Sequence, residues 1–372
     1  MDFYYHVIYF LTVSTSLLLI TVVFLNRNLG MKARLGLIIT YILIILGASC
    51  EYVVVSLESG IKLDINELNI LIRSVSKFAR YAIIPIMPVI ASKTLFEVEQ
   101  KDNIFYKTLK TYLIIEETCM LIEFFYLMKD PMSSYHEIFY QVYILTFVIC
   151  TLYMFANLIN FSKSFQDENK IIVAALIIFI VFGVSIQLTN ENVKSCWLTI
   201  AIASTFVYIY YNELIRARDD LTTLLNQNSY YNYIERLKDK VFLLIVFDVD
   251  EFKYINDTFG HTYGDKILKI VGQRVKEKYQ SYGRCYRIGG DEFAVIIEKD
   301  VDKFNEEFLK NELINSFIEE RKKFQEFPYI SYGSARYNSG EKEKYDICDI
   351  QEIADKQMYA YKQKTKQDRK NK

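Results

Sequence analysis

The sequence lacks the features that mark several common protein classes. Its formal net charge is −1, so no global basic field favours nucleic-acid binding. Six cysteines are scattered without C-x-x-C spacing, and we interpret them as small buried hydrophobic residues rather than disulfides or zinc ligands. No basic segment or small-residue cleavage site accompanies the first apolar run, so a cleaved signal peptide is not expected.

Long apolar runs are abundant, and nearly all of them lie before residue 215. Runs of about 18 to 24 residues can each cross a bilayer core of about 30 Å. The sequence therefore predicts an all-α membrane bundle of about seven spans within residues 1–212. The expected spans are roughly 4–25, 35–55, 70–91, 109–128, 137–159, 171–188 and 196–212.

The loops between these spans differ in charge. The basic residues of the first and third loops are Arg27, Lys32, Arg34, Lys93, Lys101, Lys107 and Lys110. The second loop is expected to hold Glu58, Asp64 and Glu67 with a single Lys62. The positive-inside bias therefore predicts a multi-pass protein of the cytoplasmic membrane, with the N-terminus outside and residues from 213 onward in the cytoplasm.

Charged residues inside the third and fourth spans require partners or water. Arg73, Lys77 and Arg80 share one helix face, and Glu116 and Glu123 share a face of the next span. Such residues indicate either an ion-pair seam between helices or the lining of a ligand cavity. A transporter is the rival interpretation of so many helices, but no inverted repeat is apparent, which favours a receptor or anchor.

The segment that follows the last span contains no Gly or Pro between residues 206 and 218. We expect the last helix to continue through a short helical linker, residues 213–218, into a domain at 219–366, followed by a basic tail at 367–372. The pattern from Asp219 to Asn226 predicts a capped turn, and a helix is expected from Ser229 to Lys240.

Two short segments of this domain place carboxylates at the ends of strands. Val241 to Phe247 is a continuous apolar run, typical of a strand buried on both faces, and it ends in Asp248-Val249-Asp250. A Gly289-Gly290 turn between two β-type runs carries Asp291 and Glu292. In isolation this turn also fits a solvated hairpin, but buried carboxylates favour a hard cation as partner.

The order of expected elements is strand, helix, hairpin, helix, strand, helix. The expected helices are roughly 266–280, 302–324 and 350–364, and the last strand is 329–337. This order predicts an α+β domain with a mostly antiparallel sheet, like a polymerase palm or a ferredoxin-type, nucleotidyl-cyclase-type sandwich. There, Asp248 and Asp291 can meet around one or two Mg²⁺ ions that bind a triphosphate and activate a hydroxyl.

The polar segment between the first strand and the hairpin offers further candidates. Lys253 can contact phosphate, and Asn256 and Asp265 can recognise the edge of a base. Taken singly, each also fits an ordinary loop residue.

These residues resemble the GGDEF domain of diguanylate cyclases over residues 219–366. Gly289-Gly290-Asp291-Glu292-Phe293 matches the family's signature, and the segment from Asp248 to Asp265 matches its second motif, with Gly260, His261 and Gly264 in place. Ala354-Asp355 through Tyr359 to Lys362 matches a third pattern.

The resemblance implies that two GTP molecules are joined into cyclic di-GMP with release of two pyrophosphates. It implies that Asp248, Asp291 and the carbonyl of Val249 hold Mg²⁺, with Mn²⁺ as an alternative ion. Glu292 would hold a second metal or assist deprotonation of the 3′-hydroxyl, and Asn256 with Asp265 would recognise guanine. The implied phosphate contacts are Phe252 (backbone), Lys253, Gly289, Gly290, Lys362 and Lys366.

The chain departs from the family pattern at four positions. Thr223 and Gln227 replace a usual Gly and Arg, Thr365 replaces a Gly, and Lys366 replaces an Arg, which keeps the charge but loses bidentate geometry. The family's product-inhibition motif, Arg-x-x-Asp, would fall at residues 280–283 and is absent. We therefore expect no feedback by cyclic di-GMP through that site.

The expected function is a membrane-bound diguanylate cyclase regulated by a signal that the sequence does not identify. Each domain of the family holds one GTP, so an active homodimer is implied. The alternatives are a catalytically silent GTP-binding regulator on the same fold and a membrane receptor that recruits partners.

Overall fold

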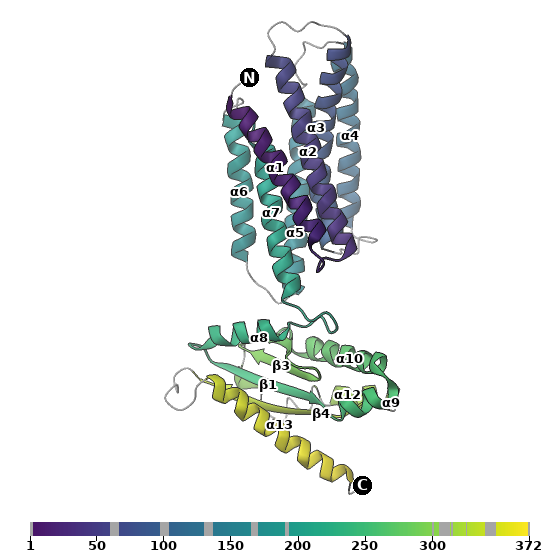
Figure 1. Cartoon of the computed structure of the whole chain (residues 1–372), viewed down its shortest axis with the longest axis vertical. Helices are drawn as coiled ribbons and strands as arrows, with labels where there is room; N and C mark the ends of the chain where they lie inside the picture. The colour runs from purple at the N-terminus through teal and green to yellow at the C-terminus, as the bar shows by residue number, and fades with distance from the viewer. Residues whose placement is uncertain are drawn as a thin grey trace. The chain divides into compact units, whose positions relative to one another are not determined.

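The structure is a computed structural model of the 372-residue chain. It describes residues 3–59, 67–96, 104–129, 137–164, 170–189, 193–299, 301–304, 313, 315–324, 326–338 and 347–370. The chain divides into two compact units, Met1–Glu213 and Leu214–Lys372 (Figure 1). Each unit is described separately below.

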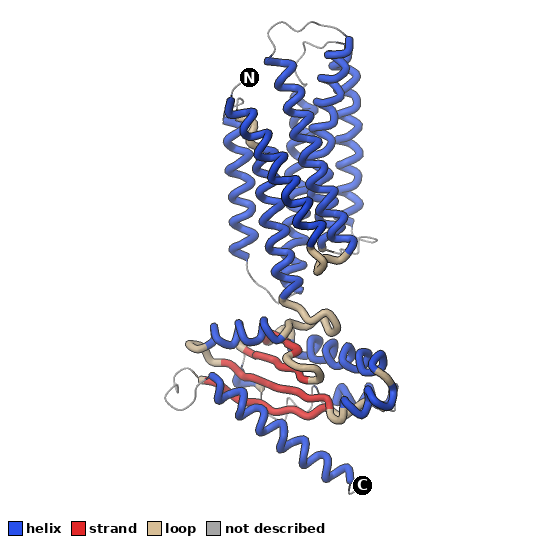
Figure 2. The backbone as a smooth tube through the Cα atoms, viewed as in Figure 1, coloured by secondary structure: helices blue, strands red, loops and turns tan. Residues whose placement is uncertain are grey.

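The first unit is built from helices alone in the residues that the structure describes (Figure 2). They are α1 (Phe3–Leu25), α2 (Met31–Ser59), α3 (Glu67–Leu95), α4 (Ile104–Lys129), α5 (Glu137–Ser164), α6 (Lys170–Thr189) and α7 (Cys196–Arg216). Five of them, α1, α2, α3, α5 and α7, contain segments long and apolar enough to cross a membrane. The structure thus supports five of the seven expected spans by these criteria.

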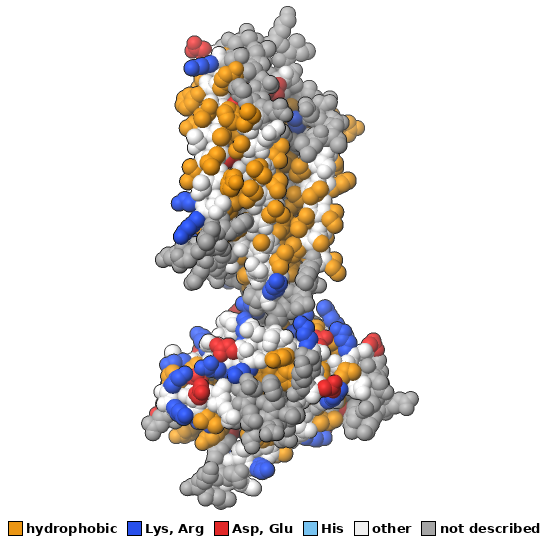
Figure 3. Space-filling view, turned by 180° about the vertical axis from the view of Figure 1, so that it is seen from behind, with side chains coloured by type: hydrophobic (Ala, Val, Ile, Leu, Met, Phe, Trp, Pro, Cys, Tyr) orange, Lys and Arg blue, Asp and Glu red, His pale blue; other side chains and the backbone are white. Residues whose placement is uncertain are grey.

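The outer surface of this unit is apolar. Leu18, Phe125 and Phe182, on three different helices, are each more than half exposed, and Figure 3 shows hydrophobic side chains spread along the visible face of the helices. In water such a surface would be unfavourable, so it indicates contact with lipid.

The basic side chains of α3 form ion pairs with acidic side chains of α2. Glu58 accepts from both Arg73 and Lys77 at 2.9 Å, and Glu51 accepts from Arg80 at 3.1 Å. The expected ion-pair seam is therefore present, but between α2 and α3. Glu58 and Glu67 do not lie in the second loop as expected, because α2 continues to Ser59 and α3 begins at Glu67.

The acids of α4 are also buried. Glu116 and Glu123 are both fully inaccessible to solvent. In the described part of the chain neither carboxylate oxygen of Glu116 has a hydrogen-bond partner. A buried acid without a partner is costly when ionised, and Glu116 takes no part in the ion pairs between α2 and α3.

Small residues allow several helices to approach one another closely. A Cβ atom added to Gly36 would lie 2.1 Å from Thr94 of α3, and one added to Gly47 would lie 1.9 Å from Trp197 of α7. A Cβ at Gly183 would lie 2.3 Å from Thr199 of α7, and the Ser195 hydroxyl donates to the Gly183 carbonyl at 3.0 Å. Contacts of this kind are typical of helix packing in membranes.

The second unit contains a four-stranded sheet in the order β2-β3-β1-β4. The strands are β1 (Phe242–Val249), β2 (Gly283–Arg287), β3 (Glu292–Ile297) and β4 (Ile330–Tyr337), and every neighbouring pair is antiparallel. The expected antiparallel sheet is confirmed, and β1 lies in its interior because its run of apolar residues is buried on both faces.

Helices cover both faces of the sheet. One core contains Phe247 of β1 with residues of α10 (His261–Tyr279) and α12 (Asn315–Lys323). The other contains Leu244 of β1 with residues of α8 (Gln227–Ile234) and α13 (Ile347–Lys370). This α/β/α layering holds the strand ends in fixed positions, which is what a site at those ends requires.

Several helices differ from expectation. The helix expected from Ser229 to Lys240 is α8, which begins at Gln227 and ends at Ile234. The last helix of the first unit ends at Arg216 rather than continuing to residue 218, because Arg218 forms a bridge with Leu225. A short helix not expected from the sequence, α9 (Phe252–Phe259), follows β1. Of the helix expected at 302–324, residues 305–312 lie outside the described residues, and α12 forms its C-terminal part.

Candidate active site

The end of β1 and the tip of the β2–β3 hairpin lie side by side. In the antiparallel register Asp248 lies opposite Glu292 on one side and Ser331 on the other. The Val249 amide donates to the carbonyl oxygen of Asp291 at 3.2 Å. The register therefore brings Asp248, Asp291 and Glu292 into one group, from segments more than 40 residues apart.

The glycines of the Gly-Gly turn leave space in the site and do not adopt an unusual backbone conformation. Among the described glycines only Gly260 has a positive φ, of 83°. A Cβ on Gly289 would lie 2.7 Å from the Glu292 carboxylate, whereas a Cβ on Gly290 would meet nothing within 4 Å. Gly289 thus admits the Glu292 side chain, and Gly290 leaves open space where a ligand can approach the backbone.

A lysine from the C-terminal helix reaches the same group. The Lys362 ammonium contacts the Asp248 carboxylate and lies 3.7 Å from Asp250. Burial disfavours the charged form of Lys362, but the hydrogen bond to Asp248 and the nearby carboxylates outweigh burial and raise its pKa. A positive charge is therefore held against the end of β1.

The acids of the hairpin tip are less acidic than usual. Burial raises the pKa of Asp291, and the negative charge of Asp248 raises it further. The pKa of Glu292 is raised by burial and then by the charges of Asp248 and Asp291. Carboxylates that raise each other's pKa form a site where a cation is favourable.

The second acid after β1 has a structural partner. The Ser331 hydroxyl donates to Asp250 at 2.6 Å, and the Asp250 amide donates to the carbonyl of Tyr329 at 2.9 Å. The sequence attributed both Asp248 and Asp250 to a cation. Ser331 for Asp250 and Lys362 for Asp248 are therefore partners that the sequence did not identify.

The expected base-recognition residues lie on α9 and α10. A Cβ on Gly264 would lie 2.0 Å from the Asn256 side-chain oxygen, so glycine allows Asn256 to pack beside the start of α10, next to Asp265. Lys253 and Asp265 are exposed, and Phe252 begins α9. Within the described ranges, no hydrogen bond or ion pair joins Lys253 or Asp265 to the carboxylate group of Asp248.

Lys366 lies one turn beyond Lys362 on α13. Its ammonium is 3.4 Å from the carboxylate of Glu251, and both side chains are exposed. Lys366 therefore lies beside the segment that follows β1, without contacting Asp248 in the described structure.

Two residues near the site were given no role in the sequence analysis. Arg287 donates to both carboxylate oxygens of Asp219 at 3.1 Å and to the carbonyl of Gly290 at 2.7 Å. Its position, two residues before the Gly-Gly turn, was the available signal. Asp355 on α13 is a further acid whose charge acts on Glu292, and its signal was the pattern from Ala354 to Lys362.

The donor chemistry of this group suits a magnesium ion. Carboxylate and carbonyl oxygens are the ligands that Mg²⁺ prefers, and Asp248, Asp291, Glu292 and the Val249 carbonyl offer them. In the described residues no three acidic, histidine or cysteine side chains already converge closely enough to form a cation site. Lys362 instead supplies the positive charge, and an ion would have to take its place.

Comparison with known proteins identifies the class of this domain. Residues 216–368 match the family model described as "Diguanylate cyclase, GGDEF domain". The probable diguanylate cyclase DgcI of Escherichia coli is 44% identical over 91 residues, which cover 24% of this chain and 20% of DgcI. The diguanylate cyclase DgcS of Shewanella oneidensis is 34% identical over 161 residues, which cover 41% of this chain and 52% of DgcS.

Solved structures are also similar to this unit. The GGDEF domain of DgcB from Caulobacter crescentus in complex with c-di-GMP is 25% identical, and the match covers 40% of this chain and 90% of that chain with a TM-score of 0.33.

Residues 216–368 are therefore a GGDEF domain of the diguanylate cyclase family. The chain spans between about a fifth and about half of the length of these two curated relatives. The helical unit that precedes the domain is outside the family match.

Proposed function

We propose that this chain is a membrane-embedded diguanylate cyclase that condenses two GTP molecules into cyclic di-GMP. In each of two steps the 3′-hydroxyl of one GTP attacks the α-phosphorus of the other. The bond to the leaving pyrophosphate breaks, and the hydroxyl proton is released. Two such steps close the ring and release two pyrophosphates, so atoms and charges balance.

The carboxylate group at the strand ends would hold the metal. Asp248, Asp291 and the carbonyl of Val249 would bind Mg²⁺ or Mn²⁺, with Glu292 at a second ion or accepting the 3′-hydroxyl proton. A bound divalent ion would neutralise charge developing on the phosphates. The raised pKa of Glu292 supports the role in proton transfer, because a general base works best when its pKa approaches the operating pH.

The surrounding residues would position the nucleotide. The open space at Gly290 admits phosphate oxygens next to the backbone of Gly289 and Gly290. Lys362, once displaced from Asp248, would contact phosphate, as would Lys253, Lys366 and the backbone at Phe252. Asn256 and Asp265 would hydrogen-bond guanine, since the close approach at Gly264 keeps them next to each other.

The reaction needs two active domains. Each GGDEF domain would hold one GTP, so the two reacting nucleotides meet only when two domains face each other as an isologous homodimer. We propose that the helical unit crosses the membrane about seven times, with the N-terminus outside and the palm-like GGDEF domain in the cytoplasm. A signal at that unit would act by favouring one pairing of the two domains.

The observation that carries this proposal is the register that sets Asp248 opposite Glu292 beside Asp291. The test uses the full-length protein in lipid nanodiscs with GTP and Mg²⁺, and product is detected by mass spectrometry. Asp291→Ala should lower the rate of cyclic di-GMP formation by about 100-fold or more. Asp220→Ala, an exposed acid away from the site, should leave the rate unchanged.

The same experiment distinguishes the alternative function. A folded dimer that binds GTP but forms no cyclic di-GMP would contradict the cyclase and favour a GTP-binding regulator on the same fold. Failure to bind GTP at all would favour a receptor that recruits partners.

A further inference from the structure

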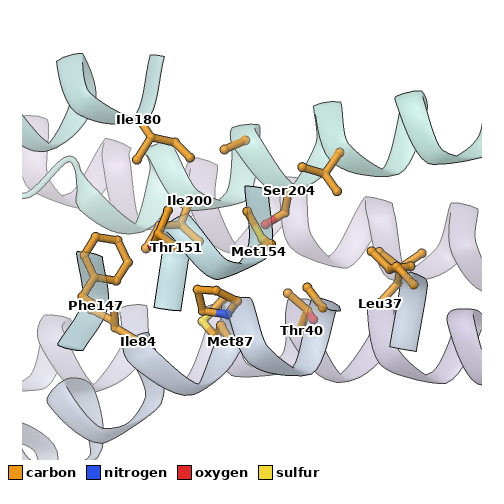
Figure 4. A pocket seen from close by; sticks show the side chains of 15 residues that line it. Leu37, Thr40, Ile84, Met87, Phe147, Thr151, Met154, Ile180, Ile200 and Ser204 are labelled. Atoms are coloured by element: carbon orange, nitrogen blue, oxygen red, sulfur yellow. The ribbon is translucent and has the colours of Figure 1, made fainter. Parts of the chain in front are cut away.

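A cavity lies inside the helical unit, among residues of α2, α3, α5, α6 and α7. Its volume is about 60 Å³, several times the roughly 10–15 Å³ that a single water requires. Figure 4 shows the lining side chains, among them Phe147, Ile180 and Ile200, entering from different helices. One water molecule would therefore not fill the space.

The lining of the cavity contains no charged side chain. Aliphatic and aromatic residues dominate it, and three hydroxyl side chains, Thr40, Thr151 and Ser204, are the polar exceptions. Transfer of an ion into such a space is strongly unfavourable. The lining thus selects a neutral, mainly apolar occupant.

Thr151 differs from other threonines in these helices. The hydroxyls of Thr40 and Thr146 donate to the carbonyls four residues earlier, Gly36 and Val142, at 2.9 and 2.8 Å. The buried hydroxyl oxygen of Thr151 has no hydrogen-bond partner among the residues that the structure describes. A buried hydroxyl without a partner is costly, and Thr151 lines the cavity, so an occupant can satisfy it.

A second feature of the lining is a helical carbonyl without its usual donor. Pro88 lies within α3 and lines the cavity. Because proline has no backbone N–H, the carbonyl of Ile84, four residues earlier, loses its usual helical donor. Ile84 is itself a lining residue, so this carbonyl is a candidate acceptor for an occupant.

We propose that this cavity is a binding site for a small neutral molecule with an apolar body and one hydroxyl group. The Thr151 hydroxyl donates to the ligand oxygen, and the ligand hydroxyl donates to the carbonyl of Ile84. The apolar body packs against Phe147, Ile180 and Ile200. This places a ligand site in the part of the chain that the GGDEF family match does not cover.

The site adjoins the helix that leads into the GGDEF domain. Ile200, Ala203, Ser204 and Val207 of α7 form part of the lining, and α7 ends at Arg216. A ligand that fills the cavity therefore contacts α7 directly. An effect of the ligand on cyclic di-GMP synthesis would rest on the proposed function, but binding itself does not.

The chain contains one tryptophan, which provides the test. Trp197 is buried on α7, three residues before Ile200, or about 4.5 Å along the helix axis. Bromine quenches tryptophan fluorescence at short range, so 4-bromo-1-butanol is the probe. Full-length protein in phosphatidylcholine nanodiscs should show saturable quenching by this alcohol.

Two further probes and two variants define the chemistry. The probe 1-bromobutane, which lacks the hydroxyl, should bind about 25-fold more weakly, the loss expected for two neutral hydrogen bonds. Charged 4-bromobutyrate should not show saturable quenching. Thr151→Val should weaken binding of the alcohol about fivefold and leave 1-bromobutane unchanged. Thr146→Val on the same helix, whose hydroxyl donates to Val142 outside the lining, should change neither.

A further variant tests whether the probe occupies the cavity. Ala203→Leu fills the cavity from α7 and should abolish saturable quenching. Linear quenching in the wild type, or equal affinities in Thr151→Val and Thr146→Val, would overturn the proposal. Strong quenching of Trp197 by brominated phosphatidylcholine would also overturn the proposal if Ala203→Leu relieved it. A lipid chain would then be the occupant. None of these outcomes depends on cyclase activity, so failure of the cyclase leaves this inference standing.

Discussion

Arg287 and Asp219, 68 positions apart in the sequence, form an ion pair in which one guanidinium nitrogen lies 3.1 Å from each carboxylate oxygen. The same guanidinium donates to the Gly290 carbonyl in the hairpin tip at 2.7 Å. One side chain thus joins the first turn of the GGDEF domain to the turn that carries Asp291. Movement of the first turn is thereby coupled to the position of the candidate metal ligands.

The first prediction concerns this ion pair. Burial opposes ionisation of Asp219, but hydrogen bonds from Thr222 and the charge of Arg287 outweigh it and lower the pKa of Asp219. Asp219→Asn should destabilise the first turn by about 1 kcal/mol at neutral pH. Hydrogen exchange of residues 219–225 measures this, and Asp220→Asn is the matched control because Asp220 is exposed.

The pH dependence of this effect follows from the direction of the shift. The pKa of Asp219 is lower in the folded protein than the value of about 3.9 expected when unfolded. The stabilisation is therefore complete above about pH 4 and is lost as the pH falls through the folded pKa. A difference between Asp219→Asn and wild type that persisted unchanged at pH 2 would contradict this account.

The second prediction concerns Thr223. Its φ is 61°, in the left-handed region that β-branched residues adopt only under strain. Glycine, which the family resemblance implies at this position, adopts this region without strain. Thr223→Gly should stabilise the domain by about 0.5–1 kcal/mol, seen as a higher thermal unfolding midpoint.

The neighbouring threonine is the control for this substitution. Thr222 is buried, and its hydroxyl donates to Asp219 at 2.7 Å. Thr222→Gly should therefore lower the midpoint. Equal effects of the two substitutions would show that strain at Thr223 is not the cause.

The third prediction concerns Lys362. Its ammonium contacts Asp248, so under the proposed function we expect it to compete with a metal ion in the absence of nucleotide. Lys362→Met should bind Mn²⁺ roughly threefold to tenfold more tightly without GTP, as expected for removal of a partly exposed charge pair. Electron paramagnetic resonance of free Mn²⁺ measures the affinity.

Lys366→Met is the matched control for this measurement. Lys366 lies on the same helix but contacts Glu251, so its loss should leave the affinity for Mn²⁺ unchanged. Weaker Mn²⁺ binding by Lys362→Met would mean that the ammonium organises the carboxylates rather than competing with the ion.

The fourth prediction concerns packing in the helical unit. A methyl group at Gly47 would lie 1.9 Å from the Trp197 ring. Gly47→Ala should therefore destabilise the unit by about 1–3 kcal/mol and shift the emission of Trp197. Gly30→Ala should be neutral in thermal unfolding, because a Cβ there meets nothing within 4 Å.

The sequence predicted features that depend on local pattern. The apolar run before Asp248 specified an interior strand, and the Gly289-Gly290 pair specified the hairpin. The capping role of Asn226 was also predictable, because a side-chain oxygen that accepts from the amide three residues later is a local interaction.

Features that depend on tertiary contacts were not predictable in this way. Glu58 looked like a loop residue, yet it lies on α2 and pairs with Arg73 and Lys77 of α3. The contact of Lys362 with Asp248 joins positions 114 residues apart. The short helix α9 follows Glu251, which has a positive φ of 57°. No sequence pattern predicted this conformation.

The side chain of Asn226 also bears on where the GGDEF domain can be separated from the rest of the chain. Its amide donates to the carbonyls of Arg216 and Arg218, and its backbone N–H donates to the carbonyl of Ala217. A soluble fragment that began at Asp219 would remove all three acceptors and leave α8 without its anchor. A fragment beginning at Leu214 would retain them, which makes the choice of first residue decisive for work on the isolated GGDEF domain.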